Sequence, residues 1–168
     1  MQDVVEDIGV GLMGSKTEGQ MNSGAILAAL SVGALLISQP ASAFGALAVG
    51  VPADVTRSGF AYGINVNAPT EAMARETALS NCRGTNPNSQ VHSQSSQPAR
   101  ALCTVVTTFH HRCAVVAQDP AAGTPGVGWA VAPTLEAATK QPIDNCKATA
   151  GESRKQFCAR DAYNCDTK

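Results

Sequence analysis

A pattern of residues occurs twice along this chain and restricts the fold to two similar units. Thr70 lies twelve residues before Cys82, and Thr134 lies twelve residues before Cys146. Each threonine follows a proline, and each proline follows a short segment that combines glycine with an aromatic residue. The pattern predicts a strand, strand, helix, strand order in each unit, with a cysteine near the end of the helix. The two segments of glycine and aromatic residues are 59–63 and 126–130.

The residues within each unit support the strand and helix assignments. Residues 60–67 alternate large apolar side chains with small or polar ones, which is the period of a half-buried strand. Thr70 and Thr134 are good helix N-caps. Glu71 and Glu136 follow in the first turns, where a carboxylate complements the helix dipole. We therefore expect one helix to follow each proline and threonine pair.

Residues 1–43 are predicted to be an export signal that is removed. An uncharged, mostly apolar stretch at 25–37 has the length of a signal peptide core and is too short to span a membrane. Residues 41–43, Ala-Ser-Ala, form a small-x-small ending, so we expect cleavage before Phe44. A buried N-terminal helix is the alternative, and Gly33 and the Ala-Ser-Ala ending favour the signal.

The residues before the apolar stretch have an unusual charge for an export signal, which normally begins with a basic segment. Lys16 is accompanied by four acidic residues between Met1 and Gly24. A start at Met13 or Met21 would remove most of this acidity. We interpret the leading residues as a mis-assigned start, with both methionines as open alternatives.

All six cysteines lie in residues 44–168, the predicted mature domain. An even number of cysteines behind an export signal is typical of an oxidising compartment, so we expect three disulfides in a periplasmic or secreted protein. The sequence has no Cys-x-x-Cys pair, which argues against zinc sites and thioredoxin-like redox sites.

The register of the repeated pattern selects one set among the possible cysteine pairs. In each unit, the cysteine that ends the helix is expected to bond with the cysteine on the following strand. The two remaining cysteines then bond with each other. The predicted disulfides are Cys82 with Cys103, Cys146 with Cys158, and Cys113 with Cys165.

Short motifs along the two units point to a family. They are Gly-Ala-Leu-Ala-Val at 45–49, Ala-Tyr-Gly at 61–63, Pro-Thr-Glu-Ala at 69–72, Asn-Cys at 81–82, Cys-Thr-Val-Val at 103–106, Gly-Trp-Ala at 128–130 and Asn-Cys at 145–146. Together they resemble the bacterial domain of unknown function 4189 family over essentially all of residues 44–166. The resemblance implies an exported protein with a double unit, and it implies no catalytic residues.

The chain departs from the pattern of that family at two places. A long polar insertion occupies Arg83–Arg100, and it has almost no apolar side chain to bury. We expect a solvated loop there, with a binding loop that includes His92 as the alternative. Pro142 lies deep in the second predicted helix, so we expect that helix to kink or to end early.

Two histidines and one tryptophan are further candidates for contact with a ligand. His110 and His111 lie beside Cys113. On an extended strand, adjacent side chains point to opposite faces, so we do not expect both imidazoles to hold one metal ion. We expect this pair to lie at the surface or to flank a turn. Trp129 and Tyr62 occupy related places in the two units, where we expect core packing, with ligand binding by Trp129 as the alternative.

Charge and missing motifs argue against several functions. The chain has 12 Lys+Arg against 13 Asp+Glu, which gives no basic field for nucleic acid. It has no Gly-x-Ser-x-Gly elbow, and the glycine cluster at 123–128 lacks the Lys-Ser/Thr of a phosphate loop. We therefore predict no catalytic, metal-binding or cofactor-binding residue. Enzymatic activity stays open, because a site assembled from distant residues leaves no motif.

These observations predict a small α+β domain held by three disulfides. Two strand-strand-helix-strand units, at about 44–112 and 113–168, are expected to form an antiparallel sheet packed against two helices. The predicted function is an exported module that binds a protein partner in the envelope or outside the cell. No nucleic acid partner is expected, nor a membrane span after signal cleavage. A small secreted hydrolase acting near His110 or His111, and a structural envelope protein, are the alternatives.

Overall fold

The structure is a computed structural model that describes residues 43–86 and 97–166. The predicted signal segment, apart from Ala43, lies outside these ranges. The first half of the described chain contains β1 (Phe44–Gly50), α1 (Val55–Ser58), β2 (Ala61–Ala68), α2 (Glu71–Arg83), α3 (Gln97–Ala101) and β3 (Thr104–Phe109). The second half contains β4 (Cys113–Gln118), β5 (Val127–Ala132), α4 (Leu135–Ala150), the 3₁₀ helix η1 (Lys155–Phe157) and β6 (Ala159–Cys165).

The strands form two three-stranded antiparallel sheets. β1 lies between β2 and β3, and β4 lies between β5 and β6. The predicted α+β class is confirmed. The strands divide into two sheets, however, where the sequence analysis expects one. An alternating pattern indicates that a strand has a buried face, but it does not indicate what covers that face.

Large apolar side chains from both sheets pack into one cluster between them. Leu47 and Val49 of β1 belong to it, together with Val116 of β4. The ring of Phe60, just before β2, stacks on the ring of Trp129 in β5, with centroids 5.7 Å apart. Each sheet thus removes the large side chains of the other from water, which favours face-to-face stacking.

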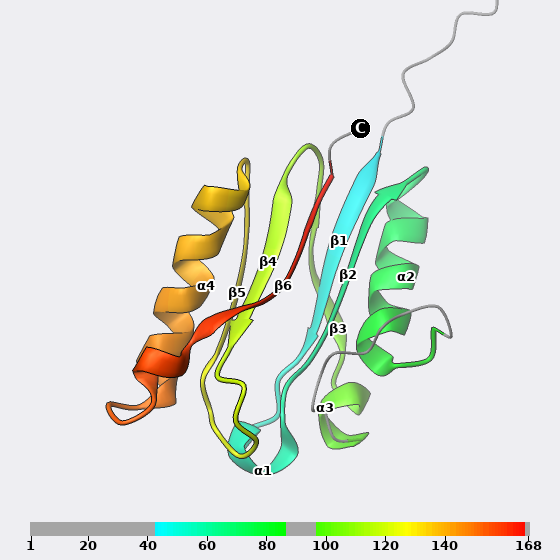
Figure 1. Ribbon diagram of the computed structural model, residues 1–168. Coiled ribbons are helices and arrows are strands. Elements are labelled where there is room, and N and C mark those ends of the chain that lie inside the picture. The colour runs from blue at the N-terminus through cyan, green and yellow to red at the C-terminus, as the bar shows by residue number, and fades with distance from the viewer. Residues whose placement is uncertain (1–42, 87–96, 167–168) are drawn as a thin grey trace, which may run out of the picture. The chain divides into compact units, whose positions relative to one another are not determined.

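Each sheet is covered on its other face by a helix. α2 packs on the first sheet through alanines that include Ala74 and Ala78. α4 packs on the second sheet through Ala138 and Cys146. Figure 1 shows the two helices on opposite sides of the strands. The small side chains let helix and sheet approach closely.

Gly63 and Gly128 mark the closest approaches of strand to helix. A Cβ added at Gly63 would lie 2.2 Å from the carbonyl oxygen of Ala78, and one added at Gly128 would lie 2.2 Å from the carbonyl oxygen of Pro142. Gly63 lies in β2 and Gly128 lies in β5, and each of these is the second strand of its sheet in chain order. Any larger residue at either place would push the helix away from the sheet.

Both long helices begin where the sequence predicts. The hydroxyl oxygens of Thr70 and Thr134 each accept a hydrogen bond of 3.2 Å from the backbone N–H three residues later. α4 then continues through Pro142 to Ala150, so the expected early end is wrong. Pro142 is fully buried against the sheet, and this packing holds the helix where local propensity disfavours it.

The structure has three disulfides, and they are the pairs expected from the repeated pattern. Two of them join the end of a long helix to the residue just before the following strand. The third joins directly paired positions on β4 and β6. The bonds are Cys82–Cys103, Cys146–Cys158 and Cys113–Cys165.

The polar insertion is described only at its two ends. α2 ends at Arg83, and Gly84 caps it in the left-handed conformation. At the other end, α3 takes up residues that were expected to be a solvated loop, and Ala99 is fully buried there. Ala99 is buried because it packs with the alanines between β1 and α2. Residues 87–96, which include His92, lie outside the described residues.

Candidate binding groove

Trp129 lies between the apolar core and the surface of the protein. Its ring belongs to the apolar cluster between the sheets and stacks on Phe60 with an interplanar angle of 15°. The same residue is only half-buried and lines a groove on the surface. A ring that stacks on a buried neighbour and also lines a groove is a rigid apolar contact surface.

The groove has a volume of about 850 Å³ and lies between α4 and the segment 51–56 that follows β1. The beginning of β5 lines it between these two walls. Val51, Pro52 and Pro125 add to the apolar surface of Trp129. Val51 is 41% exposed, so the apolar surface is accessible. The groove therefore has the size and lining of a binding site.

β5 is an edge strand, since the order of the second sheet is β5-β4-β6. At the start of the strand, the N–H of Val127 donates to the hydroxyl oxygen of Thr149 on α4, at 3.2 Å. α4 thus satisfies a backbone group at the edge of β5 and closes one end of the groove. Beyond this point the edge borders the groove beside Trp129.

Two side-chain amides on α4 line the groove, and the structure gives them no hydrogen bond within the described residues. They are Gln141 and Asn145, and both are exposed. Asn81 on α2 stands in the related place, because its Cβ approaches Gly63 as the Cβ of Asn145 approaches Gly128. The side-chain N–H of Asn81 donates to the carbonyl of Ile64 at 3.0 Å. Asn81 is thus engaged with a strand, whereas the side chain of Asn145 lines the groove.

Asp54 supplies the negative charge of the groove. Its carboxylate caps α1 by accepting hydrogen bonds from the hydroxyl of Thr56 and from the N–H of Arg57. These bonds, the one from Thr56 first, hold the pKa of Asp54 below its ordinary value. The carboxylate is therefore ionised at neutral pH, and it favours a partner that brings a hydrogen-bond donor or a cation to this wall.

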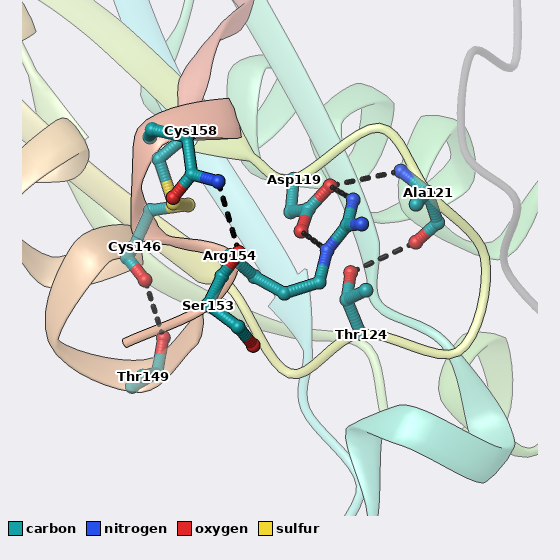
Figure 2. Close-up of polar contacts among 9 residues, drawn as sticks. Asp119, Ala121, Thr124, Cys146, Thr149, Ser153, Arg154 and Cys158 are labelled. Atoms are coloured by element: carbon teal, nitrogen blue, oxygen red, sulfur yellow. Dashed lines mark hydrogen bonds and ion pairs between the residues drawn. A yellow bond between two sulfur atoms is a disulfide. The ribbon is translucent and has the colours of Figure 1, made fainter. Parts of the chain in front are cut away.

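A buried ion pair shapes the β4–β5 loop that leads into the groove (Figure 2). Arg154 donates from Nε and Nη2 to the two carboxylate oxygens of Asp119, at 2.6 and 2.7 Å. The N–H of Ala121 also donates to Asp119, and Thr124 donates back to the carbonyl of Ala121. The hydrogen bonds from Arg154 lower the pKa of Asp119 most, and the other donors lower it further. These hydrogen bonds to Asp119 fix the loop that ends at Pro125.

Sequence reasoning missed this ion pair, together with the groove amides. Asp119 and Arg154 are 35 residues apart and belong to no motif. The weak signal in the sequence is the position of Asp119 directly after the apolar run of β4, where a lone carboxylate needs a partner.

His110 and His111 lie in the turn between β3 and β4, away from the groove. The expectation of extended backbone is wrong for His111, whose φ is 48°, and the two ring centroids are 5.4 Å apart. The turn brings the rings together on one side. No group of three His, Cys, Asp or Glu side chains in the described part of the chain could hold a metal ion.

Within the described residues, the Nδ1 of His110 has no hydrogen-bond partner, so no hydroxyl or thiol is paired with it there. Its ring packs against Phe44, with centroids 4.3 Å apart. The hydroxyl of Thr108 in the same small pocket donates to Glu71 at 3.2 Å, so it is engaged with a carboxylate rather than with the imidazole. Of the four contact candidates, the structure places Trp129 in the groove and the two histidines elsewhere, while His92 is not described.

Comparison with known proteins gives one match. A family model described as Domain of unknown function (DUF4189) matches residues 44–165. No curated protein and no solved structure matches. Among the described helices, none is both long and apolar enough to cross a membrane.

Proposed function

The chain belongs to the DUF4189 family, and we propose that it is an exported module that binds an extended segment of a protein partner in the groove beside β5. The single observation that carries the proposal is that the ring of Trp129 lines the groove along the edge of a strand together with two amides, Gln141 and Asn145, which form no hydrogen bond with any other described residue. An extended peptide supplies apolar side chains and backbone hydrogen-bond groups in alternation, which this surface fits.

Export is supported by two features of the described residues. All six cysteines are bonded, which is typical of an oxidising compartment. β1 and the family match both begin at Phe44, so cleavage after Ala43 would remove the predicted signal and leave the first strand whole. We place the protein in the periplasm or outside the cell.

Duplication of one ancestral unit belongs to the same proposal. The two sheets share one strand order, and both contain a glycine that lies against a helix at a related asparagine. After a duplication, one copy can keep its asparagine in the fold while the other copy uses it for binding. Asn81 and Asn145 fit this division.

The test begins with a photocrosslinking amino acid at position 141 in the full chain, exported and oxidised in its own host. The control carries the same group at Lys147, which is exposed on α4 and does not line the groove. We expect a crosslinked partner from position 141 only. The crosslinked peptide is then synthesised and its affinity for the protein is measured by calorimetry.

Asn145→Ala should weaken binding of that peptide about tenfold, since a buried hydrogen bond contributes about 1 to 1.5 kcal/mol. Lys147→Ala should leave the affinity unchanged. Equal crosslinking from both positions, or equal affinity of both variants, would contradict the groove as the binding site. Turnover of a substrate by the pure protein would contradict the binding role and favour the hydrolase.

A further inference from the structure

Asp166, directly after β6, is a buried carboxylate without a strong partner. The residue is 2% exposed. Its Oδ2 accepts a hydrogen bond of 3.1 Å from the N–H of His111 and lies 3.8 Å from Nδ1 of His110. Its Oδ1 and the Nδ1 of His110 are both buried and have no hydrogen-bond partner among residues 43–86 and 97–166. A buried carboxylate in this condition is costly, because it has lost water and gained little in return.

The charged and titratable groups around Asp166 do not include a paired permanent cation among the described residues. His110 and His111 are the titratable residues that lie against Asp166. The carbonyl of Arg112 accepts a hydrogen bond from the N–H of Asp166, whereas its side chain lines the pocket that holds Phe44 and Glu71. The carboxylate of Glu71 is engaged with Thr108 and lies 3.9 Å from Arg75. In the described part of the chain, Asp166 therefore forms no ion pair with a lysine or an arginine.

The start of β1 contacts the same turn that holds this carboxylate. Gly45 pairs with Phe109, so Phe44 comes opposite His110, and their rings are in contact. Cys113 pairs with Cys165, so Asp166 comes opposite Arg112. Phe44 and Asp166 therefore lie on either side of residues 110–112, and Figure 1 shows the start of β1 and the end of β6 at the same end of the strands.

We propose that Asp166 is the binding site for the α-ammonium group of Phe44, which is formed when the export signal is removed. The proposal rests on the proposed export and its cleavage position. Hydrolysis of the bond between Ala43 and Phe44 consumes one water, leaves a carboxylate on Ala43, and turns the amide nitrogen of Phe44 into an amine that takes up a proton. Before cleavage that nitrogen is a neutral amide. After cleavage it is the cation that the buried carboxylate lacks.

This ion pair would tie the first strand of one sheet to the end of the last strand of the other sheet. The export signal would thereby act on the fold, since the uncleaved chain has the carboxylate and lacks its partner. Charge-assisted hydrogen bonds of this kind are about twice as strong as neutral ones. The processed chain is accordingly expected to hold its N-terminus in place more firmly than the uncleaved chain.

The test measures the pKa of the α-amino group of Phe44 by NMR, in full chain that has been exported and processed. An α-amino group ordinarily titrates at about 7.7 to 8.0. We expect a pKa at least about one unit higher, which is a tenfold tighter hold on the proton. Asp166→Asn should return it to the ordinary range. Glu71→Gln is the control, because Glu71 lines a pocket together with Phe44, and this change should leave the raised pKa unchanged.

An ordinary α-amino pKa in the wild-type protein would overturn the proposal, and this measurement stands even if Asp166→Asn does not fold. A raised pKa that is lost in Glu71→Gln and kept in Asp166→Asn would overturn it too. The N-terminus of the exported protein is read separately by mass spectrometry. Cleavage elsewhere would contradict the proposed export site, whereas a normal pKa in a chain that begins at Phe44 contradicts the ammonium site alone.

Discussion

Arg154 donates hydrogen bonds to both carboxylate oxygens of the buried Asp119. This contact joins the segment after α4 to the loop between β4 and β5. The side chain of Asp119 is fully buried, whereas that of Arg154 is 35% exposed. The two residues therefore contribute unequally. Removal of the arginine leaves a buried charge, while removal of the aspartate leaves an arginine that can reach water.

Arg154→Ala is expected to lower the free energy of unfolding by about 2 to 3 kcal/mol, because it leaves the buried Asp119 carboxylate without its cationic partner. This loss is smaller than the loss expected for a fully buried ion pair, since water already reaches the arginine. Asp119→Asn should cost less. Denaturant unfolding of the oxidised protein measures both values, and a smaller loss for Arg154→Ala than for Asp119→Asn would contradict this account.

The same pair predicts how stability depends on acid. The pKa of Asp119 is lowered in the folded protein by the hydrogen bonds from Arg154 first. The ionised Asp119 therefore contributes to stability above the unfolded pKa of about 3.9, and this contribution is lost as the pH falls through the lower folded pKa. The unfolding free energy of Arg154→Ala should fall less steeply below about pH 4 than that of the wild type. Parallel curves for the two proteins would exclude Asp119 as the cause.

Gly128→Ala is expected to lower the free energy of unfolding by about 1 to 3 kcal/mol, because the added Cβ meets the backbone carbonyl of Pro142 at 2.2 Å. Gly63→Ala should have a similar effect through Ala78. Neither glycine needs a positive φ, so the loss measures the contact between strand and helix alone. Thermal unfolding of both variants checks this, and a stable Gly128→Ala would show that α4 can move off the sheet.

Loss of the disulfides should bring the protein close to unfolding. The three bonds close separations of 12, 21 and 52 residues. In the chain-entropy model each contributes roughly 3 to 4 kcal/mol, with the largest effect for the longest loop. We therefore expect the double change Cys113→Ser and Cys165→Ser to cost more stability than Cys146→Ser and Cys158→Ser. Denaturant midpoints give the order, and the reverse order would contradict the model.

Tyr62 on β2 donates its hydroxyl hydrogen bond to Asp161 on β6 and so joins the two sheets. Burial first, and then this bond, raise the pKa of Tyr62. The protonated Tyr62 hydroxyl therefore contributes to stability below the unfolded pKa of about 10, and this contribution is lost as the pH rises through the higher folded pKa. Tyr62→Phe should leave the tyrosinate absorbance of the folded protein unchanged up to about pH 11, at a cost of about 1 kcal/mol. A smaller absorbance change in the variant would show that Tyr62 ionises normally.

The strands and the starts of the two long helices could be predicted because they depend on neighbours in the sequence. Thr70 and Thr134 cap their helices through backbone groups three residues away. Residues 60–67 carry the alternation of a strand, and β2 covers nearly all of them. The cysteine pairs followed from the repeated pattern, because related positions in two similar units lie near related partners.

The candidate sites were mostly beyond prediction for the opposite reason. Asn81 and Asn145 have the same local sequence position, yet one donates to a strand carbonyl and the other lines a groove. The difference comes from segment 51–56, which lies near Asn145 only in the folded chain. The two histidines were expected on opposite faces, and the left-handed backbone of His111 was not evident from its residue type.

The sequence by itself determined the starts of the two long helices, because periodicity and capping act over short distances along the chain, and its repeated pattern of residues indicated the cysteine pairs. Only the tertiary structure decided that the units form two stacked sheets, that α4 passes through Pro142, and that Asp119 and Asp166 are buried. These outcomes depend on which surfaces meet and exclude water. Such contacts join residues that are distant in the chain, so no local sequence pattern predicts them.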